Sequence, residues 1–328
     1  MVLLIVIIAV ALGFDFTNGF HDSANAIACS ISTRALSPRV ALPMAAALNM
    51  AGAFAGQKVA QTVGKGIVLL PADSLKVVLA ALLGAIAWNL ITWYFGIPSS
   101  SSHALIGGLA GATLVAVGTS GVEWGGIWHK VIIPMVSSPV IGLLVAFTLM
   151  NVLLLIVFRW APQPVNRTFR RLQPLSGAAV AFAHGSNDAQ KTMGVITLAL
   201  ITSGHLVPSA AIPWWVILLA ATSMALGTYS GGRRIIKTLG QKVVRLDPIH
   251  GFAADASSAA VIYTAAHFGF PISTTQSITA SIMGAGATRG LSSVKWGVAG
   301  NIVWAWILTI PAAGAAAAGA YLLVNLVH

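Results

Sequence analysis

The sequence is poor in charged residues. Asp, Glu, Lys and Arg make up 8% of its 328 residues, whereas soluble domains carry about 25%. Apolar residues make up 57% of the chain, and long apolar runs recur, for example at 75–95, 131–158 and 296–327. Each run is long enough to cross the hydrocarbon of a bilayer. The pattern excludes an ordinary soluble domain and predicts an all-α polytopic membrane protein with the lipid bilayer as a partner.

Acids and cysteine are scarcer still. Seven acids face 18 Lys and Arg, which gives a net charge of +11, and Cys29 is the single cysteine. One cysteine excludes an intrachain disulfide. The bases gather at 32–39, 159–171 and 231–245, which is typical of the cytoplasmic loops of membrane proteins. We therefore do not expect nucleic acid as a partner.

Common enzyme motifs are missing as well. The sequence contains no H-E-x-x-H, G-x-S-x-G or Walker A motif, so we expect neither an enzyme nor a cofactor. An intramembrane hydrolase that uses Ser102 with His103, or His184 with Asp188, is one alternative, and a channel is another. These polar segments occur twice in the chain, which is unusual for a catalytic nucleophile and disfavours the hydrolase.

What the sequence does contain is an internal repeat. The segment FGIPSSSSHALIGGLAGA begins at Phe95, and FGFPISTTQSITASIMGAGA begins at Phe268, 173 positions later. Upstream, the polar segment at 18–25 aligns with 184–191, 166 positions later. We therefore expect two homologous transmembrane repeats, which cover residues 1–158 and 175–328 and are joined by a basic cytoplasmic linker, 159–174.

The two repeats are expected to have inverted topology. Basic segments follow the first helix of the first half (32–39) and the second helix of the second half (231–245), so the halves begin on opposite sides of the membrane. Lys58 and Lys65 fall outside in this arrangement, against the rule. Inverted repeats with broken helices are typical of secondary transporters, whose sites lie near the membrane midplane between the repeats.

Each repeat contains a proline followed by a run of hydroxyl side chains. Pro98 precedes Ser99–Ser102, and Pro271 precedes 273–275. Irregular backbone at membrane depth is tolerated only against protein or a wet cavity, so we expect paired re-entrant hairpins; an ordinary proline kink is the alternative. Free N–H groups at the helix starts favour an anion there. The candidate substrate-binding residues at the tips are Ser100, Ser101, Ser102, His103, Ser273, Thr274, Thr275 and Gln276.

Polar residues also share one helix face in each half. With the spacing i, i+4, i+7, these residues are Asn18, Asp22 and Asn25, and then His184, Asp188 and Lys191. A charge at the bilayer centre costs about 2.5–3.5 kcal/mol even on insertion scales, so it indicates function. Two carboxylates repel an anion unless a cation accompanies it. The pattern therefore predicts a symporter for an anion and a cation.

The cation-coupling candidates are Asp22, Asp188, Asn18 and Lys191, and the ligands for a bound metal ion would be Asp22, Asn25 and Asp188. Carboxylate and amide oxygens suit such an ion. Lys191 is interpreted as a built-in cation beside Asp188. The alternative is a lysine whose ammonium group snorkels to the membrane interface.

At NGFHDSANA (18–26) and HGSNDAQKTMG (184–194), the sequence resembles the inorganic phosphate transporter (PiT) family, with the motifs in the same order over essentially the whole chain. The resemblance implies an inverted-repeat fold in the plasma membrane, phosphate as substrate, a symported cation, both termini outside and a homodimer. The family's site residues fall on Asp22, Asn25, Asn187 and Asp188, and on the Ser and Thr of the tips.

One position departs from the family pattern. Sodium-coupled members tend to repeat the Asn of N-D-x-A-N in both halves, whereas Lys191 stands at this position in the second half. This resembles the bacterial low-affinity branch, which implies coupling to H+ and transport of phosphate partly as a neutral metal–phosphate complex. Coupling to Na+ stays open, as does a sulfate or other tetrahedral-oxyanion permease of the same fold.

Overall fold

The computed structural model describes residues 1–71, 74–231, 235–236 and 238–326, and these residues are almost entirely helical. Within this part of the chain, the single β pairing is an isolated antiparallel bridge between Val68 and Val122. The predicted all-α class is confirmed. The α-helices are α1 (Val2–Ser32), α2 (Pro38–Ala53), α3 (Lys58–Lys65), α4 (Leu75–Phe95), α5 (Ser101–Ala116), α6 (Trp124–Ile127), α7 (Ile133–Val157), α8 (Pro162–Thr202), α9 (Trp214–Ser230), α11 (Pro248–Phe268), α12 (Thr274–Ala287) and α13 (Trp296–Leu326).

Several of these helices are long and apolar enough to cross a membrane. Among the described residues they are α1, α4, the continuous stretch Trp124–Val157 and α13, and the pair α2–α3, bent by 71°, forms a fifth span if it is counted as one. The predicted run 75–95 coincides with α4. The run predicted at 131–158 begins earlier, because a π-helical turn (Trp128–Ile132) joins α6 to α7.

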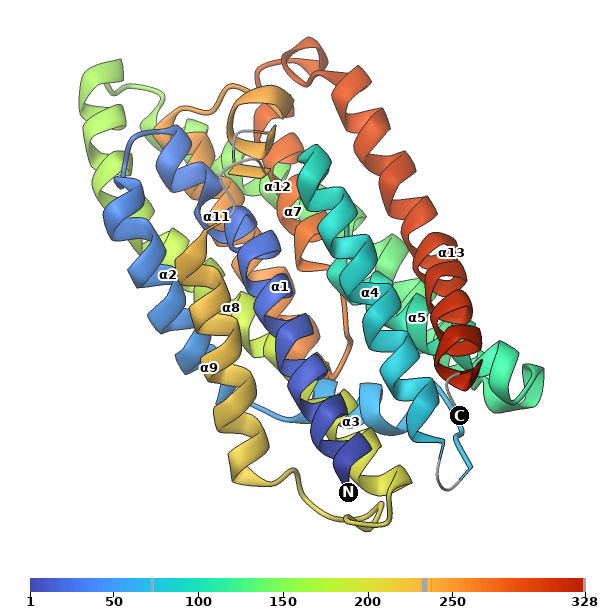
Figure 1. Cartoon of the computed structure of the whole chain (residues 1–328). Coiled ribbons are helices and arrows are strands. Elements are labelled where there is room, and N and C mark those ends of the chain that lie inside the picture. Colours follow the sequence, from blue (N-terminus) through green and yellow to red (C-terminus); the bar gives the residue numbers. More distant parts are fainter. Residues whose placement is uncertain (72–73, 232–234, 237, 327–328) are drawn as a thin grey trace.

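The same order of elements occurs twice. A long first helix (α1, α8) is followed by a hairpin of two helices (α4–α5, α11–α12) and then by a short 3₁₀ turn and a final helix (α7, α13). The N-terminus and the end of α13 lie at the same end of the molecule (Figure 1). This order is the one that a repeat requires, and the division at 158 and 175 stays a prediction.

The basic segment 159–174 is not a simple linker. Residues from Pro162 onward are helical and continue through Pro174 into the second repeat, so that α8 has 41 residues. Pro162 lies in the first turn of the helix, where a missing N–H costs nothing. The prediction that Arg167, Arg170 and Arg171 lie in a loop is therefore wrong, since they lie on the first turns of α8. Of the third basic segment, Arg233, Arg234 and Lys237 lie outside the described residues.

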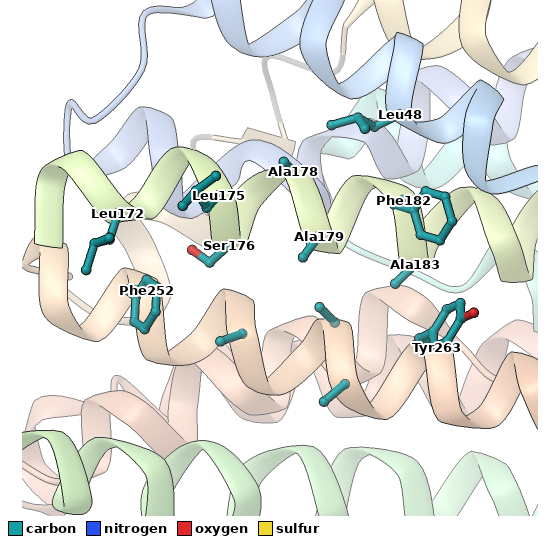
Figure 2. Close-up of a pocket in the computed structure, with 13 residues that line it drawn as sticks. Leu48, Leu172, Leu175, Ser176, Ala178, Ala179, Phe182, Ala183, Phe252 and Tyr263 are labelled. Carbon is teal, nitrogen blue, oxygen red and sulfur yellow. The ribbon is translucent and has the colours of Figure 1, made fainter.

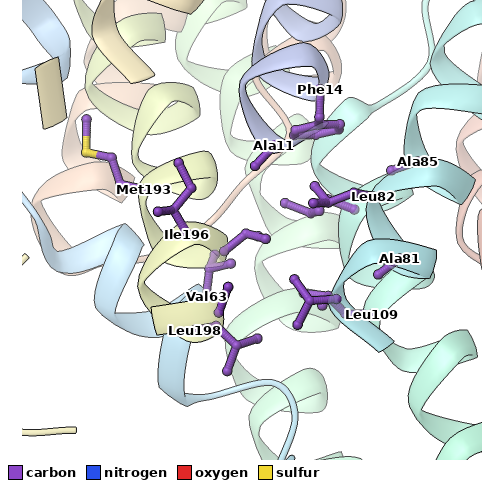
Figure 3. Packing of buried hydrophobic residues seen from close by; sticks show 14 of the residues in the cluster. Ala11, Phe14, Val63, Ala81, Leu82, Ala85, Leu109, Met193, Ile196 and Leu198 are labelled. Carbon is purple, nitrogen blue, oxygen red and sulfur yellow. The ribbon is translucent and has the colours of Figure 1, made fainter. Parts of the chain in front are cut away.

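Two apolar clusters lie toward opposite ends of α1 and α8. One cluster contains residues of α1 up to Phe14 and residues of α8 from Ala189 onward. The other contains residues of α1 from Ala26 onward and residues of α8 up to Ala183. Figure 3 shows Ala11 and Phe14 of α1 facing Ile196 of α8 and Leu82 of α4 in the first cluster. The two helices are therefore antiparallel, and the polar segments 15–25 and 184–191 lie between two apolar layers.

Glycines let α2 approach α8 closely. A Cβ added at Gly52 would lie 2.1 Å from the carbonyl oxygen of Phe182, and one added at Gly185 would lie 2.1 Å from the carbonyl oxygen of Asn49. Real Cβ atoms do not come so near. Small residues at such crossings allow backbones to pack closely in membranes. This packing holds the middle of α8, which carries Asp188 and Lys191, firmly in the core.

Candidate substrate and cation site

The predicted hairpin tips occur where proline interrupts each apolar run. α4 ends at Gly96 (φ 66°) and α11 ends at Gly269 (φ 80°), both in the left-handed region that favours glycine. The chain resumes as α5 and α12, with 16 and 14 residues. At a rise of about 1.5 Å per residue, neither spans a hydrocarbon core of about 30 Å. Both helices therefore begin inside the protein, as re-entrant hairpins require.

The two tips begin in the same way and touch each other. The hydroxyl of Ser100 accepts a hydrogen bond from the backbone N–H of His103, and the hydroxyl of Ser273 accepts one from Gln276, each at 3.2 Å. Serine caps of this kind stabilise helix starts. His103 and Gln276, which occupy equivalent positions in the repeat, lie 3.4 Å apart through Nδ1 and Nε2. The starts of α5 and α12 therefore meet in the core.

A hydrogen-bonded network surrounds Asp22 on α1. Its Oδ1 accepts from the Thr275 hydroxyl at 3.0 Å and from Asn25 Nδ2 at 3.2 Å. Its Oδ2 accepts a short hydrogen bond from the Ser101 hydroxyl. His21 Nδ1 lies 2.7 Å from Oδ1. Asp22 is 1% exposed, so these hydrogen bonds satisfy a carboxylate that water does not reach.

A second network surrounds Asp188 on α8. Lys191 Nζ lies 2.5 Å from Oδ1, and the Thr274 hydroxyl donates to Oδ2 at 3.0 Å. The ammonium group also donates to the Ile272 carbonyl at 2.9 Å and, by a short bond, to the Ser102 hydroxyl. Lys191 is 1% exposed. The alternative of a snorkelling lysine is therefore wrong, because the ammonium group lies in the core and not at an interface.

The contacts of the two networks follow the repeat. The contact from Ser101 to Asp22 corresponds to the contact from Thr274 to Asp188. Similarly, the hydrogen bond from Asn25 to Thr275, at 2.7 Å, corresponds to the bond from Lys191 to Ser102. Each helix face thus contacts the tip of its own half and the tip of the other half, and the two faces converge as expected.

The two carboxylates lie close enough to share a cation. Ligand atoms of Asp22, His184 and Asp188 lie within 4.8 Å of one another. His184 joins the two carboxylates of the predicted ligand set, and the third predicted ligand, Asn25, donates its Nδ2 to Thr275 and Asp22 and keeps its Oδ1 unpaired among the described residues. However, both oxygens of Asp188 already contact donors, one of which is a cation. The arrangement suits a sodium ion poorly as long as the Lys191–Asp188 pair is intact.

Several buried polar atoms in this region have no hydrogen-bond partner among the described residues. They are Asn25 Oδ1, His103 Nε2, Asn187 Oδ1 and Gln276 Oε1. Buried polar groups are usually satisfied, and exceptions call for an explanation such as a bound ligand or water. The unpaired atoms come from both hairpin tips and both polar helices, so a small polar ligand at the centre would reach all of these elements.

The described surface also has a hollow away from the polar centre. It has a volume of about 750 Å³, lies along α8 and α11, and is lined mostly by Ala, Leu and aromatic side chains, among them Phe182 and Tyr263 (Figure 2). A concave apolar face on a chain of this composition suits lipid better than an anion. The polar centre lies deeper, between the tips and α1.

Other predicted residues have local roles. Ser100 and Ser273 use their hydroxyl oxygens as caps. Asn187 donates to the backbone carbonyl of Phe270 at 3.1 Å, next to the second tip. The site residues predicted from the sequence did not include His21, which contacts both Asp22 and the Thr92 hydroxyl, or Asp15. Asp15 lies one turn before Asn18 in the same apolar helix. A carboxylate in such a helix is itself the sequence signal that indicates a functional residue.

Comparison with known proteins decides the family. A family model described as the phosphate transporter family, PHO4, matches residues 18–317. The chain belongs to the phosphate transporter family. It is 49% identical to a probable low-affinity inorganic phosphate transporter of Mycobacterium bovis over 99% of this chain and 78% of the relative. It is also 45% identical to one of Bacillus subtilis over 100% of this chain and 98% of the relative. The resemblance stated from the two motifs is confirmed.

A solved structure agrees with this assignment. The structure described as "The sodium-dependent phosphate transporter" superposes with a TM-score of 0.92 at 29% identity and covers 100% of both chains. Together with the apolar helices, the family makes this a multi-pass membrane protein, and in bacteria the membrane is the plasma membrane. Because the family consists of transporters, the prediction that the chain is not an enzyme is also confirmed.

Proposed function

We propose that this chain is a secondary active symporter that imports inorganic phosphate with a cation, and that the cation is a proton. The observation that carries the proposal is the Lys191–Asp188 pair, at 2.5 Å, between the two hairpin tips. Relatives at 45–49% identity are named as probable low-affinity inorganic phosphate transporters. The predicted homodimer and the metal–phosphate form of the substrate stay predictions.

The balance of charge in the core supports a cation that is transported together with phosphate. The described core contains Asp15, Asp22, Asp188 and Asp255 against one lysine, Lys191, so with neutral histidines it already carries excess negative charge. Adding phosphate adds one or two further negative charges in a medium of low dielectric, where repulsion is strong. The loaded site therefore requires positive charge from solution if it is to close and cross the membrane.

Lys191 supports a proton and not sodium. A sodium ion binds through several oxygens, but the ammonium group fills the space between Asp188, the Ser102 hydroxyl and the Ile272 carbonyl. A fixed cation there leaves protonation as the simpler way to neutralise the remaining charge. The structural neighbour, described as sodium-dependent, supplies the alternative of Na+ coupling for this chain.

The polar atoms support phosphate over sulfate. The tips carry hydroxyls at Ser101, Ser102, Thr274 and Thr275. They donate to Asp22, Asp188 and the Ile272 carbonyl in this structure, and by rotation they can donate to any tetrahedral oxyanion instead. Asp22 is an acceptor as well. Monohydrogen phosphate carries a proton that a carboxylate can accept, whereas sulfate carries none and would be repelled. Both the coupling ion and the choice of anion can be tested in one system.

The test is uptake of radioactive phosphate by proteoliposomes that contain the purified protein. An imposed pH gradient, alkaline inside, should drive accumulation in sodium-free buffer, and a tenfold excess of sulfate should leave it unchanged. Liposomes that carry the Asp22→Asn variant are the matched control. Accumulation that needs a sodium gradient would replace the proton by sodium, and inhibition by sulfate would point to the oxyanion permease.

A further inference from the structure

Asp15 on α1 is a buried carboxylate beside the site that the symporter proposal leaves unused. It is 0% exposed, and neither of its carboxylate oxygens has a hydrogen-bond partner in the described part of the chain. The hydroxyl of Thr192, directly after Lys191 on α8, is also buried and unpartnered there. The polar side chains that interact with Asp15 are those of Thr192 and Asn18.

The charged groups that act on Asp15 come from α8. They are Asp188 and Lys191, and Lys191 is bonded to Asp188 and not to Asp15. Among the other helices packed along α1, α9 and α12 contain no Asp, Glu, His, Lys or Arg. Lys76 of α4 donates its hydrogen bond to Asn325. Arg39 of α2 and His267 of α11 are exposed, and His250 of α11 contacts Arg289. No cation therefore contacts the Asp15 carboxylate among the residues described.

Asp15 also lies at a boundary. The next residue toward the N-terminus, Phe14, belongs to the apolar cluster with Ala11, Leu82 and Ile196 (Figure 3). On the other side, Asn18 begins the hydrogen-bonded network around Asp22. The carboxylate thus separates the apolar layer near the N-terminal end of α1 from the polar core. A group that exchanges an ion with water when this layer opens would have to occupy such a position.

The three buried carboxylates on α1 and α8 differ in what compensates their burial. Asp188 has Lys191, and Asp22 has donors from Ser101, Thr275 and Asn25. Asp15 has only the nearby side chains of Thr192 and Asn18, and its oxygens accept no hydrogen bond among the described residues. Burial without a cation or a hydrogen-bond donor disfavours a charge. We propose that Asp15 carries the co-transported proton: it is protonated when phosphate is occluded and ionises only when the core opens to water. This inference rests on the proposed proton symport.

The proposal separates coupling from binding. Phosphate would bind among the tips, Asp22 and the Lys191–Asp188 pair, and the proton would bind separately, about two helical turns from Asp22. Asn has nearly the same shape as Asp and is always neutral. A protein with Asn at this position therefore resembles the protonated form permanently and can exchange phosphate across the membrane, but it cannot link that exchange to proton movement.

The experiment compares Asp15→Asn with Asp22→Asn, the same chemical change on the same helix. Two readouts are taken on each variant in proteoliposomes: exchange of labelled for unlabelled phosphate at equal pH on both sides, and accumulation driven by a pH gradient. We expect Asp15→Asn to keep exchange within about threefold of wild type and to lose gradient-driven accumulation, together with the phosphate-dependent proton flux seen by a trapped pH dye. Asp22→Asn should lose both. Asp15→Glu, which restores a carboxyl, should accumulate phosphate again.

Two results would overturn the assignment. Accumulation by Asp15→Asn at the wild-type level would place the proton elsewhere, and loss of exchange together with accumulation in folded protein would make Asp15 part of binding. If Asp15→Asn does not elute as folded protein, the same two readouts on Asp15→Ser decide. A wild-type protein that ignores the pH gradient would refute the proton symport itself, so that failure is distinguished from failure of Asp15.

Discussion

Replacing Lys191 by Asn tests the central pair most directly, because the first half carries Asn25 at the equivalent position. The change removes the ammonium group that lies 2.5 Å from Asp188 and 2.9 Å from the Ile272 carbonyl. It leaves Asp188 buried with the Thr274 hydroxyl and His184 as neighbours. Removing one partner of a buried ion pair costs about 3–5 kcal/mol, so the melting temperature should fall by several degrees.

The double variant Lys191→Asn/Asp188→Asn separates the pair from the packing. It removes both charges, so it should melt above Lys191→Asn alone, because the isolated charge accounts for most of the loss. Sodium should also stabilise the single variant if it binds in the vacated space, by about 2.7 kcal/mol at 100 times its Kd. Uptake by this variant should fall in sodium-free buffer and recover in part with sodium.

Thermal unfolding of the purified variants in sodium or choline chloride supplies the measurement, and uptake in the same salts accompanies it. The wild type should be indifferent to the choice of salt. The reasoning is refuted if Lys191→Asn melts no lower than the double variant and its uptake ignores sodium. Sodium-driven uptake by the wild type would refute the role of Lys191 as the substitute cation.

Three further predictions concern the site and the packing around it. Asp22→Asn should abolish phosphate uptake while its gel-filtration profile stays that of the wild type; normal uptake would make Asp22 structural. Ser101→Ala and Thr274→Val each remove a hydroxyl next to a carboxylate. A hydrogen bond to a charged group contributes about 1.5–3 kcal/mol, so the half-saturating phosphate concentration should rise more than tenfold. An unchanged value would place phosphate elsewhere. Gly185→Ala should lower the melting temperature, because its Cβ would lie 2.1 Å from the Asn49 carbonyl and overpacking costs about 1–3 kcal/mol; Gly13→Ala, with no described atom within 4 Å, is the control.

The sequence predicted the parts of the fold that depend on local pattern. Apolar length placed α4 at 75–95, and Pro98 and Pro271 marked the breaks before α5 and α12. The alignment of the two repeats added long-range information, because it paired Asp22 with Asp188 from the sequence alone. The contacts in the structure follow the same alignment, from Ser101 to Asp22 and from Thr274 to Asp188. Internal homology thus supplied long-range information that periodicity alone does not contain.

Other features depend on tertiary packing, which the local sequence pattern does not predict. The run at 159–174 is basic and lies between the two repeats, so it was interpreted as a linker, yet Pro162 begins a helix that continues into the core. Whether Lys191 snorkels or stays buried depends on the tip of the opposite half, which supplies the Ile272 carbonyl. Asp255 of α11 is fully buried near Ser30 of α1 and Gly177 of α8, because α11 packs against both helices.

The two halves of the site are alike in their hydroxyl groups and differ in their charges. Equivalent hydroxyls at Ser101 and Thr274 make equivalent contacts, so they give the centre a near-symmetric set of donors that suits a tetrahedral oxyanion. Along the polar faces of α1 and α8 the halves differ in charge at two positions: Lys191 corresponds to Asn25, and Ala181, which lies in the other apolar cluster, corresponds to Asp15. A cation is coupled to an anion when the site closes only with its charge compensated, because an unpaired buried charge is costly. Lys191 and Asp15 change the charge of the core, so they change which loaded states can close. Lys191→Asn and Asp15→Asn should therefore alter the coupling of transport.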